Sequence, residues 1–192
     1  MTLFTTQEFA KNIKNKILNS KTIELFSAYI KLNALKIITD DINETSELTL
    51  VARWHPHDLC SKASDLEVYE YCKVKGWKFG IDTTLHQKLY TFDRNYILLG
   101  SNNITLSGLG LKPSHNTEAG TFIKPDIKDF DKIDLVYKNV TWMDDIIYSK
   151  IKDIIKNTPA SDEKMQWPEE LKKILYKPIE GLWSYEFPLI AP

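Results

Sequence analysis

Cysteine is scarce in this sequence of 192 residues, which contains only Cys60 and Cys72. Two cysteines cannot form the disulfide framework that stabilises small secreted domains, and they do not stand at the paired spacing of a zinc site. We therefore expect two buried free thiols in a protein of a reducing compartment, which favours the cytoplasm.

Long apolar runs are also missing. The first residues, MTLFTTQEFAKNIKNKI, contain no hydrophobic core of a signal peptide, and no later segment is apolar over the length that spans a bilayer. No amphipathic stretch combines basic residues on one face with bulky apolar residues on the other. We expect a cytoplasmic protein that has no membrane partner.

Net charge is almost absent, because 25 Lys and Arg residues balance 26 Asp and Glu residues to give a formal charge of −1. A nucleic-acid partner would therefore be held by a local basic patch and not by overall charge. The chain also lacks internal repeats and low-complexity segments. With 43% hydrophobic residues it can bury one good core, so we expect a single domain over residues 1–192.

Strand and helix patterns alternate along a core of about residues 1–124. Thr6 is a candidate cap for the first helix, and Ser64 with Glu67 forms a candidate capping box for the third. Apolar periodicity predicts helices over about 6–17, 32–42 and 64–75, and strands over 23–29, 48–54, 77–81, 85–92 and 96–99. This alternation predicts an α/β fold, a mixed β-sheet flanked by helices on both faces.

The remainder, about residues 125–192, has helical character and is predicted to be a C-terminal extension. Apolar spacing predicts helices over 141–157 and 168–176. We expect the aromatic, proline-containing tail over 182–192 to pack on the domain.

Six residue types at fixed spacing form the most specific pattern in the chain. His86 and Lys88 are separated by one residue, an aspartate follows after four more, and Gly-Ser-x-Asn follows after six. Such a pattern rarely arises by chance. Its members are His86, Lys88, Asp93, Gly100, Ser101 and Asn103.

The residue types suit phosphoryl transfer. On a strand, His86 and Lys88 project from the same face, one pleat apart, which places an imidazole beside a fixed cation. Gly100 allows close backbone approach at the end of the next strand, where the Ser101 hydroxyl and Asn103 amide can hydrogen-bond phosphate oxygens. A neutral histidine can attack phosphorus to form a phosphohistidine, while Lys88 and Asn103 meet the charge that develops on the non-bridging oxygens.

The pattern resembles the HKD signature of the phospholipase D superfamily, whose members cleave phosphodiesters without a metal. The resemblance implies that the protein needs no cofactor. Asn116-Thr117-Glu118 falls where nucleases of this superfamily carry an Asn-x-Glu element. It implies that Glu118 accepts a hydrogen bond from the catalytic histidine and fixes its tautomer, and that Asp93 supports local structure.

The stretch up to Glu118 resembles the nuclease branch of the superfamily, especially its metal-independent restriction endonucleases. The similarity lies in the strand that ends at Arg53, the helix start Ala63-Ser64-Asp65-Leu66 and the strand LHQKLY. It implies DNA as the substrate, a phosphate contact at Arg53 and a role in restriction or phage defence. Those enzymes usually carry a recognition domain after the nuclease domain, and nothing after Lys124 is long enough for one. We therefore expect an isolated domain or the nuclease subunit of a larger defence system.

The remaining histidines are His55, His57 and His115, and none has a lysine two residues later. His55 and His57 stand beside Asp58, but two imidazoles and one carboxylate without a further Cys or His make a poor zinc site. We interpret this segment as a loop that leaves a strand, and His115 as a loop residue.

Only one motif is therefore present, whereas the chemistry of the superfamily uses two histidines. A C2 dimer places the same surface of both subunits together, so two copies of His86 can share one active site. The sequence predicts a homodimeric, metal-independent phosphodiesterase acting on DNA, in which Lys88, Ser101 and Asn103 hold phosphate and Glu118 orients His86. The alternatives are an RNA or lipid phosphodiesterase and a non-catalytic nucleic-acid-binding subunit.

Overall fold

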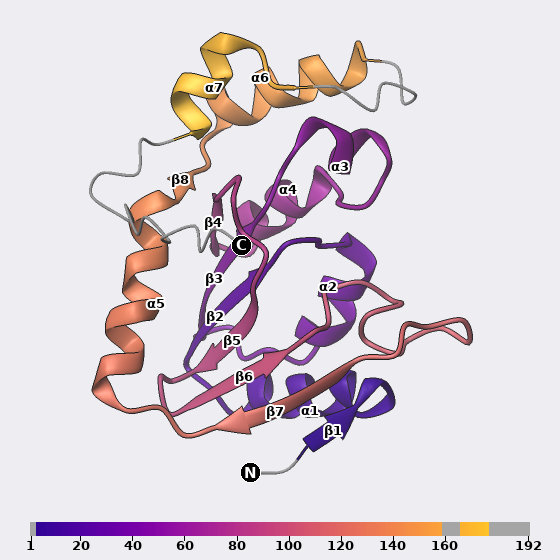
Figure 1. Cartoon of the computed structure of the whole chain (residues 1–192), viewed down its shortest axis with the longest axis vertical. Coiled ribbons are helices and arrows are strands. Elements are labelled where there is room, and N and C mark those ends of the chain that lie inside the picture. The colour runs from indigo at the N-terminus through magenta and orange to yellow at the C-terminus, as the bar shows by residue number, and fades with distance from the viewer. Residues whose placement is uncertain (1–2, 159–165, 177–192) are drawn as a thin grey trace, which may run out of the picture.

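The fold is built on one eight-stranded sheet. A computed structural model of the chain describes residues 3–158 and 166–176. The strand order is β1-β7-β6-β5-β2-β3-β4-β8 (Figure 1). The neighbours β2, β3 and β4 are parallel, and the other neighbouring pairs are antiparallel. The strands are β1 (Leu3–Thr5), β2 (Thr22–Ser27), β3 (Glu47–Ala52), β4 (Lys78–Ile81), β5 (Lys88–Phe92), β6 (Tyr96–Gly100), β7 (Ala119–Ile123) and β8 (Thr141–Trp142).

Helices cover both faces of this sheet. Successive residues of a strand point to opposite faces, and on β2 the buried Leu25 belongs to one core cluster while Phe26 belongs to another. The Leu25 cluster includes side chains of α1, α2, α4, α6 and α7, and the Phe26 cluster includes Ile133 of α5. The helices are α1 (Thr6–Leu18), α2 (Leu32–Thr39), α3 (Pro56–Cys60), α4 (Glu67–Val74), α5 (Ile127–Asn139), α6 (Asp145–Lys156) and α7 (Glu169–Leu175). The predicted α/β fold with a mixed, two-sided sheet is confirmed.

The first helix follows its predicted periodicity but begins one residue earlier than its predicted cap implies. Phe9, Ile13 and Ile17 are buried on its inner face. The N-cap is Thr5, whose backbone N–H donates to the Glu8 carboxylate at 2.9 Å. Thr6 does not cap the helix, because its hydroxyl is hydrogen-bonded to the segment before β7.

The capping box predicted for the helix over 64–75, which is α4 in the structure, is also wrong. The N-cap of α4 is Leu66, without a side-chain hydrogen bond. The Ser64 hydroxyl instead accepts from the backbone N–H of Ile30 at 3.3 Å, so it fixes the loop after β2 and lies two residues before the N-cap. The end of α4 agrees with the prediction, since Gly76 follows it with a φ of 70°.

A buried carboxylate fixes α5 to the second face of the sheet. Glu24 of β2 is only 5% exposed, and its Oε1 accepts from the hydroxyl of Tyr137 at 2.7 Å and from the guanidinium of Arg94 at 3.1 Å. Arg94 also pairs with Asp134 on the same helix. Because a buried carboxylate is stable only when it is paired and hydrogen-bonded, these contacts join α5 to the β5–β6 turn and to β2.

The C-terminal extension contains more structure than the sequence predicted. α5 was not predicted as a separate element, and the helix predicted over 141–157 is divided into β8 and α6. Asp144, two residues after β8, caps α6, because its carboxylate accepts from Ile147 N at 2.8 Å. α7 lies within the predicted 168–176 helix, and the tail over 182–192 lies outside the described residues. None of the described helices is long and apolar enough to cross a membrane.

Candidate active site

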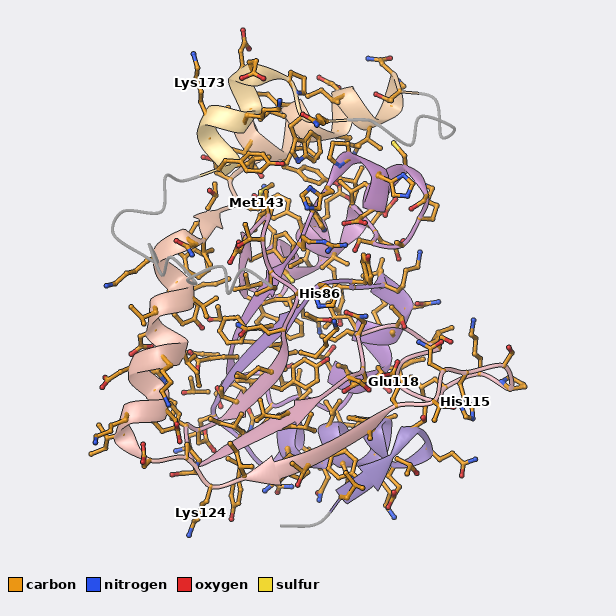
Figure 2. All side chains as sticks on the ribbon, viewed as in Figure 1. His86, His115, Glu118, Lys124, Met143 and Lys173 are labelled. Atoms are coloured by element: carbon orange, nitrogen blue, oxygen red, sulfur yellow. The ribbon has the colours of Figure 1, made fainter. Side chains whose placement is uncertain are left out.

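The pairing of the strands brings the motif residues to one end of the sheet. Ser27 at the end of β2 pairs with Lys88 at the start of β5, and Gly100 at the end of β6 pairs with Gly120 near the start of β7. The ends of β2 and β6 therefore meet the starts of β5 and β7. We call this the site end of the sheet, and His86 and Glu118 lie there (Figure 2).

His86 is exposed at the site end, next to the ammonium of Lys88. The Lys88 Nζ lies 2.7 Å from the His86 backbone oxygen and 3.4 Å from its Nδ1. β5 begins at Lys88, so His86 belongs to the segment before the strand and not to the strand predicted from residue 85. The predicted juxtaposition of imidazole and cation nevertheless forms, because the lysine side chain reaches back over the preceding backbone.

Lys88 stands between a positive and a negative neighbour. Partial burial lowers the pKa of its ammonium, and the charge of Arg53 lowers it further, while Glu118 acts in the opposite direction. An ammonium with a lowered pKa has incomplete charge compensation from the protein. It is therefore a favourable partner for an anion such as a phosphodiester.

Glu118 is buried and tightly held, but not by His86. Ser101 donates its hydroxyl hydrogen to Glu118 Oε2, and Asn116 Nδ2 donates to Oε1 at 2.9 Å. Within the described residues, His86 is not among the hydrogen-bond donors of this carboxylate. The implied contact with His86 is absent from this arrangement, and the Ser101 hydroxyl hydrogen expected to bind phosphate is occupied by Glu118.

Thr6 is a site residue that the sequence analysis did not identify. Its Oγ1 accepts from the Glu118 backbone N–H at 2.7 Å and donates to the Asn116 carbonyl at 2.9 Å. A single buried hydroxyl on α1 thus holds both ends of the Asn-x-Glu element. The two partners are 110 and 112 residues away along the chain, so no local pattern signals this contact.

Asn103 is oriented by the end of β2. Its Oδ1 accepts from the backbone N–H of Tyr29 at 3.1 Å and lies 3.4 Å from the Ser27 hydroxyl. Because the carbonyl oxygen is engaged in these contacts, the amide nitrogen is the part of the side chain left to donate to a ligand. Ser27 is also the strand partner of Lys88, which brings the amide and the ammonium together.

Arg53 follows β3 at the site end, where Asp58 and Tyr29 hold its guanidinium. Its Nε lies 3.1 Å from Asp58 Oδ2, and its guanidinium carbon lies 4.9 Å from the Tyr29 ring centroid. Residues 56–60, interpreted as a loop, form the short helix α3, in which Pro56 occupies the first turn and Asp58 reaches back to Arg53. His57 is exposed, and within the described ranges no group of three or more His, Cys, Asp or Glu residues is placed to hold a metal ion.

The two glycines of the site end allow close packing beneath the site. A Cβ on Gly100 would lie 3.0 Å from the Phe9 ring, and one on Gly120 would lie 2.7 Å from it. Asp93 lies at the opposite end of the β5–β6 hairpin with a φ of 51°, and its carboxylate accepts from the backbone N–H groups of Lys21 and Thr22 at 2.8 Å. This geometry supports a scaffold role for Asp93. His115 lies on the loop before Glu118 (Figure 2).

Comparison with known proteins identifies the family. Residues 8–139 match the family model described as the PLD-like domain of cardiolipin synthase. This match covers more than half of the chain, so the protein belongs to the PLD-like domain family. Among curated proteins, none matches the sequence.

Three solved structures share the fold of this chain. Nuc from Salmonella typhimurium, a phospholipase D family member, is 15% identical with a TM-score of 0.56, and the alignment covers 72% of this chain and 91% of Nuc. NucT from Helicobacter pylori is also 15% identical, with a TM-score of 0.52 and coverage of 71% and 92%. Phosphatidylserine synthase from Haemophilus influenzae Rd KW20 is 17% identical with a TM-score of 0.59, and the alignment covers 81% of this chain and 42% of the synthase. These similarities show the fold alone, and they do not show the restriction-endonuclease branch.

Proposed function

We propose that the protein is a metal-independent phosphodiesterase that cleaves DNA, with His86 as its nucleophile. The observation that carries this proposal is the convergence of His86, Lys88 and Asn103 at one end of the sheet. An exposed imidazole stands beside an ammonium, and an amide oriented through its oxygen lies in the segment that follows the neighbouring strand β6. These groups supply a nucleophile and two donors for the oxygens of a phosphodiester.

The reaction proceeds in two balanced steps. A nitrogen of His86 attacks phosphorus, the bond from phosphorus to the leaving oxygen breaks, and a second protonated histidine gives its proton to that oxygen. Water then attacks the phosphohistidine and gives a proton to the second histidine, which releases the phosphate ester and restores both groups. Lys88 and Asn103 stabilise the charge on the non-bridging oxygens in both steps.

The second histidine is supplied by another copy of the chain. One chain contains one motif, and its other histidines lack the neighbouring lysine. An isologous dimer with His86 near its twofold axis places the partner's His86 across the same phosphorus. The exposure of His86 at the site end supports this arrangement, because the ring is accessible to a partner surface.

DNA is the favoured substrate because the resemblance of the motif region is to nucleases of restriction systems. Arg53 supports this choice as a phosphate contact, since its positive charge lowers the pKa of Lys88 and Asp58 fixes its guanidinium at the site end. In this role the protein acts in restriction or phage defence, alone or with further subunits. RNA cleavage and non-catalytic nucleic-acid binding are the alternatives within the same substrate class.

A lipid substrate is the second candidate. The matching family model is described as the PLD-like domain of cardiolipin synthase, and one protein with a similar structure is a phosphatidylserine synthase. In that case the same histidine would attack the phosphorus of a phospholipid to form the phosphohistidine. The phosphodiester chemistry is shared, so the substrate decides between the two functions.

One assay separates these functions. Purified protein is incubated with labelled DNA, with labelled RNA and with phospholipid vesicles, each in the presence of EDTA, alongside the His86→Ala variant. We expect cleavage of DNA in EDTA and none by the variant. Activity that requires magnesium contradicts the histidine mechanism, and activity confined to vesicles assigns the site to lipids.

A further inference from the structure

A cleft lies beside the site end of the sheet, against α7. It has a volume of about 510 Å³ and is lined by His55, Pro56, Gln166, Lys172 and Tyr176. Small-ligand sites typically occupy about 300–1,000 Å³. Three of the lining residues belong to the segment 166–176, which lies beyond the residues matched by the family model. The cleft is therefore an addition to the PLD-like domain.

His55 connects this cleft to the candidate catalytic residues. It lies two positions after Arg53, and the backbone of Thr83, three positions before His86, is close enough to its ring to act on the pKa of that ring. The segment between β4 and β5, which contains Thr83 and His86, is fixed to β3 at its start, because Asp82 N donates to the Ala52 carbonyl at 3.1 Å. The wall of the cleft that contains His55 thus lies next to the segments that carry Arg53 and His86.

The opposite wall, α7, is anchored to the core. Leu171 and Leu175 are buried, and the indole N–H of Trp167 donates to the Trp54 carbonyl at 3.1 Å. The Thr141 hydroxyl donates to the Ile174 carbonyl at 2.9 Å. These contacts hold the exposed face of α7 in a fixed position opposite His55. The cleft is therefore preformed, which lowers the entropic cost of binding.

The lining combines the groups that recognise a nucleotide. Tyr176 is 40% exposed and offers an aromatic face, and Gln166 offers an exposed amide that can donate to and accept from a base edge. Burial lowers the pKa of His55, so at neutral pH its ring is an uncharged surface. Lys172 pairs with Glu169 at 2.8 Å, an exposed pair of the kind worth about 0–1 kcal/mol, so its ammonium can turn to a phosphate.

We propose that this cleft binds one unstacked nucleotide of the substrate strand beside the phosphodiester that is cleaved. The base lies against Tyr176 with its edge at Gln166, and Lys172 binds the phosphate of that nucleotide. This inference rests on the proposed function, because the candidate active site supplies the nucleic-acid strand. A base within a duplex cannot enter the cleft without leaving its stack, so the site selects single-stranded DNA over duplex.

The test measures binding in the absence of cleavage. Fluorescence anisotropy compares a labelled single strand with its matched duplex on the His86→Ala protein, and then on the same protein with Tyr176→Leu. We expect tighter binding of the single strand, and a loss of about tenfold with Tyr176→Leu, because stacking of one base on an aromatic ring is worth that much. Duplex binding should not change, and Tyr176→Phe should retain single-strand binding.

Two control variants match the chemistry outside the cleft. Tyr96 is also 40% exposed, but it lies at the start of β6, away from the site end. Lys132 forms the same type of i,i+3 pair, with Asp129. Tyr96→Leu and Lys132→Ala should therefore preserve binding, whereas Tyr176→Leu and Lys172→Ala should weaken it. Equal effects in each matched pair, or equal losses for single strand and duplex, overturn the inference. Binding of neither form by the His86→Ala protein also overturns it.

A small diester distinguishes failure of this site from failure of the proposed function. Bis(4-nitrophenyl) phosphate carries no flanking nucleotide, so wild type and Tyr176→Leu should hydrolyse it equally. If wild type cleaves neither DNA nor this diester but binds single strands through Tyr176, the proposed catalysis is wrong and the cleft stands. If both substrates are cleaved and Tyr176→Leu matches Tyr96→Leu in binding, the cleft is wrong and the catalysis stands.

Discussion

Replacing Thr6 with Val tests how the Asn-x-Glu element is held. Thr6 is 4% exposed, and its Oγ1 accepts from Glu118 N at 2.7 Å and donates to the Asn116 carbonyl at 2.9 Å. Valine has a similar shape, so the substitution opens little space. It removes both hydrogen bonds and leaves two backbone groups without their partner.

The two groups contribute unequally to the expected cost. A buried donor without a partner costs about 1–3 kcal/mol. The bond to the Glu118 amide is buried, whereas the bond to the Asn116 carbonyl is only partly buried, so water can replace the second one more readily. We expect the free energy of unfolding to fall by about 2 kcal/mol. Because the Glu118 backbone loses its anchor, we also expect the rate of DNA cleavage to fall about tenfold.

Urea unfolding and a cleavage assay measure the two effects on the same samples. Thr6→Ser is the matched control, since it keeps the hydroxyl and loses only a methyl group. It should stay close to wild type in activity. If Thr6→Val unfolds at the same urea concentration as Thr6→Ser with an unchanged m value, the hydroxyl does not hold this element. If its cleavage rate equals that of Thr6→Ser, the position of Glu118 does not matter to the reaction.

Three further predictions concern the dimer, the pH dependence and the second face of the sheet. When equal amounts of wild-type and His86→Ala chains exchange subunits, the activity should be about a quarter of that of the same total amount of wild type, because only wild-type pairs hold both histidines. An activity of about half would show that each chain works alone. The pKa of Lys88 is lowered, so as pH rises the cleavage rate should begin to fall at a pH below 10.5, the ordinary pKa of lysine. Lys88→Arg should move this fall to higher pH, and an unmoved fall would exclude Lys88 as its cause. Tyr137→Phe removes a donor to the buried Glu24 carboxylate, so the free energy of unfolding should fall by about 1–3 kcal/mol with cleavage unchanged, and equal stability would argue against this network.

The sequence was most informative where one local rule decided the structure. The spacing of Phe9, Ile13 and Ile17 predicts the buried face of α1, because each step of four residues returns to the same side of a helix. The pairing of His86 with Lys88 was also predictable, since only one residue separates them. The sequence also contains a signal for α5, in the capping box of Asp126 and Asp129.

Contacts between distant segments were not predictable. The partner of Glu118 depends on how β6 and β7 pair, which places Ser101 beside the carboxylate, and no short pattern specifies that register. The roles of Thr6 and Ser64 were misassigned for the same reason. Their hydroxyls satisfy the capping pattern locally, but partners from other elements compete for them more successfully.

The packing of Phe9 against Gly100 and Gly120 couples the geometry of the candidate site to the distance between α1 and the sheet. Gly100 immediately precedes Ser101, and Gly120 lies two residues after Glu118. Helix α1, which carries Phe9, also carries Thr6 in its first turn. A bulkier residue at either glycine, or a different ring at position 9, would change this spacing and carry Thr6 with it. Substitutions in the dry interior, far from any substrate, can therefore adjust the position of the carboxylate.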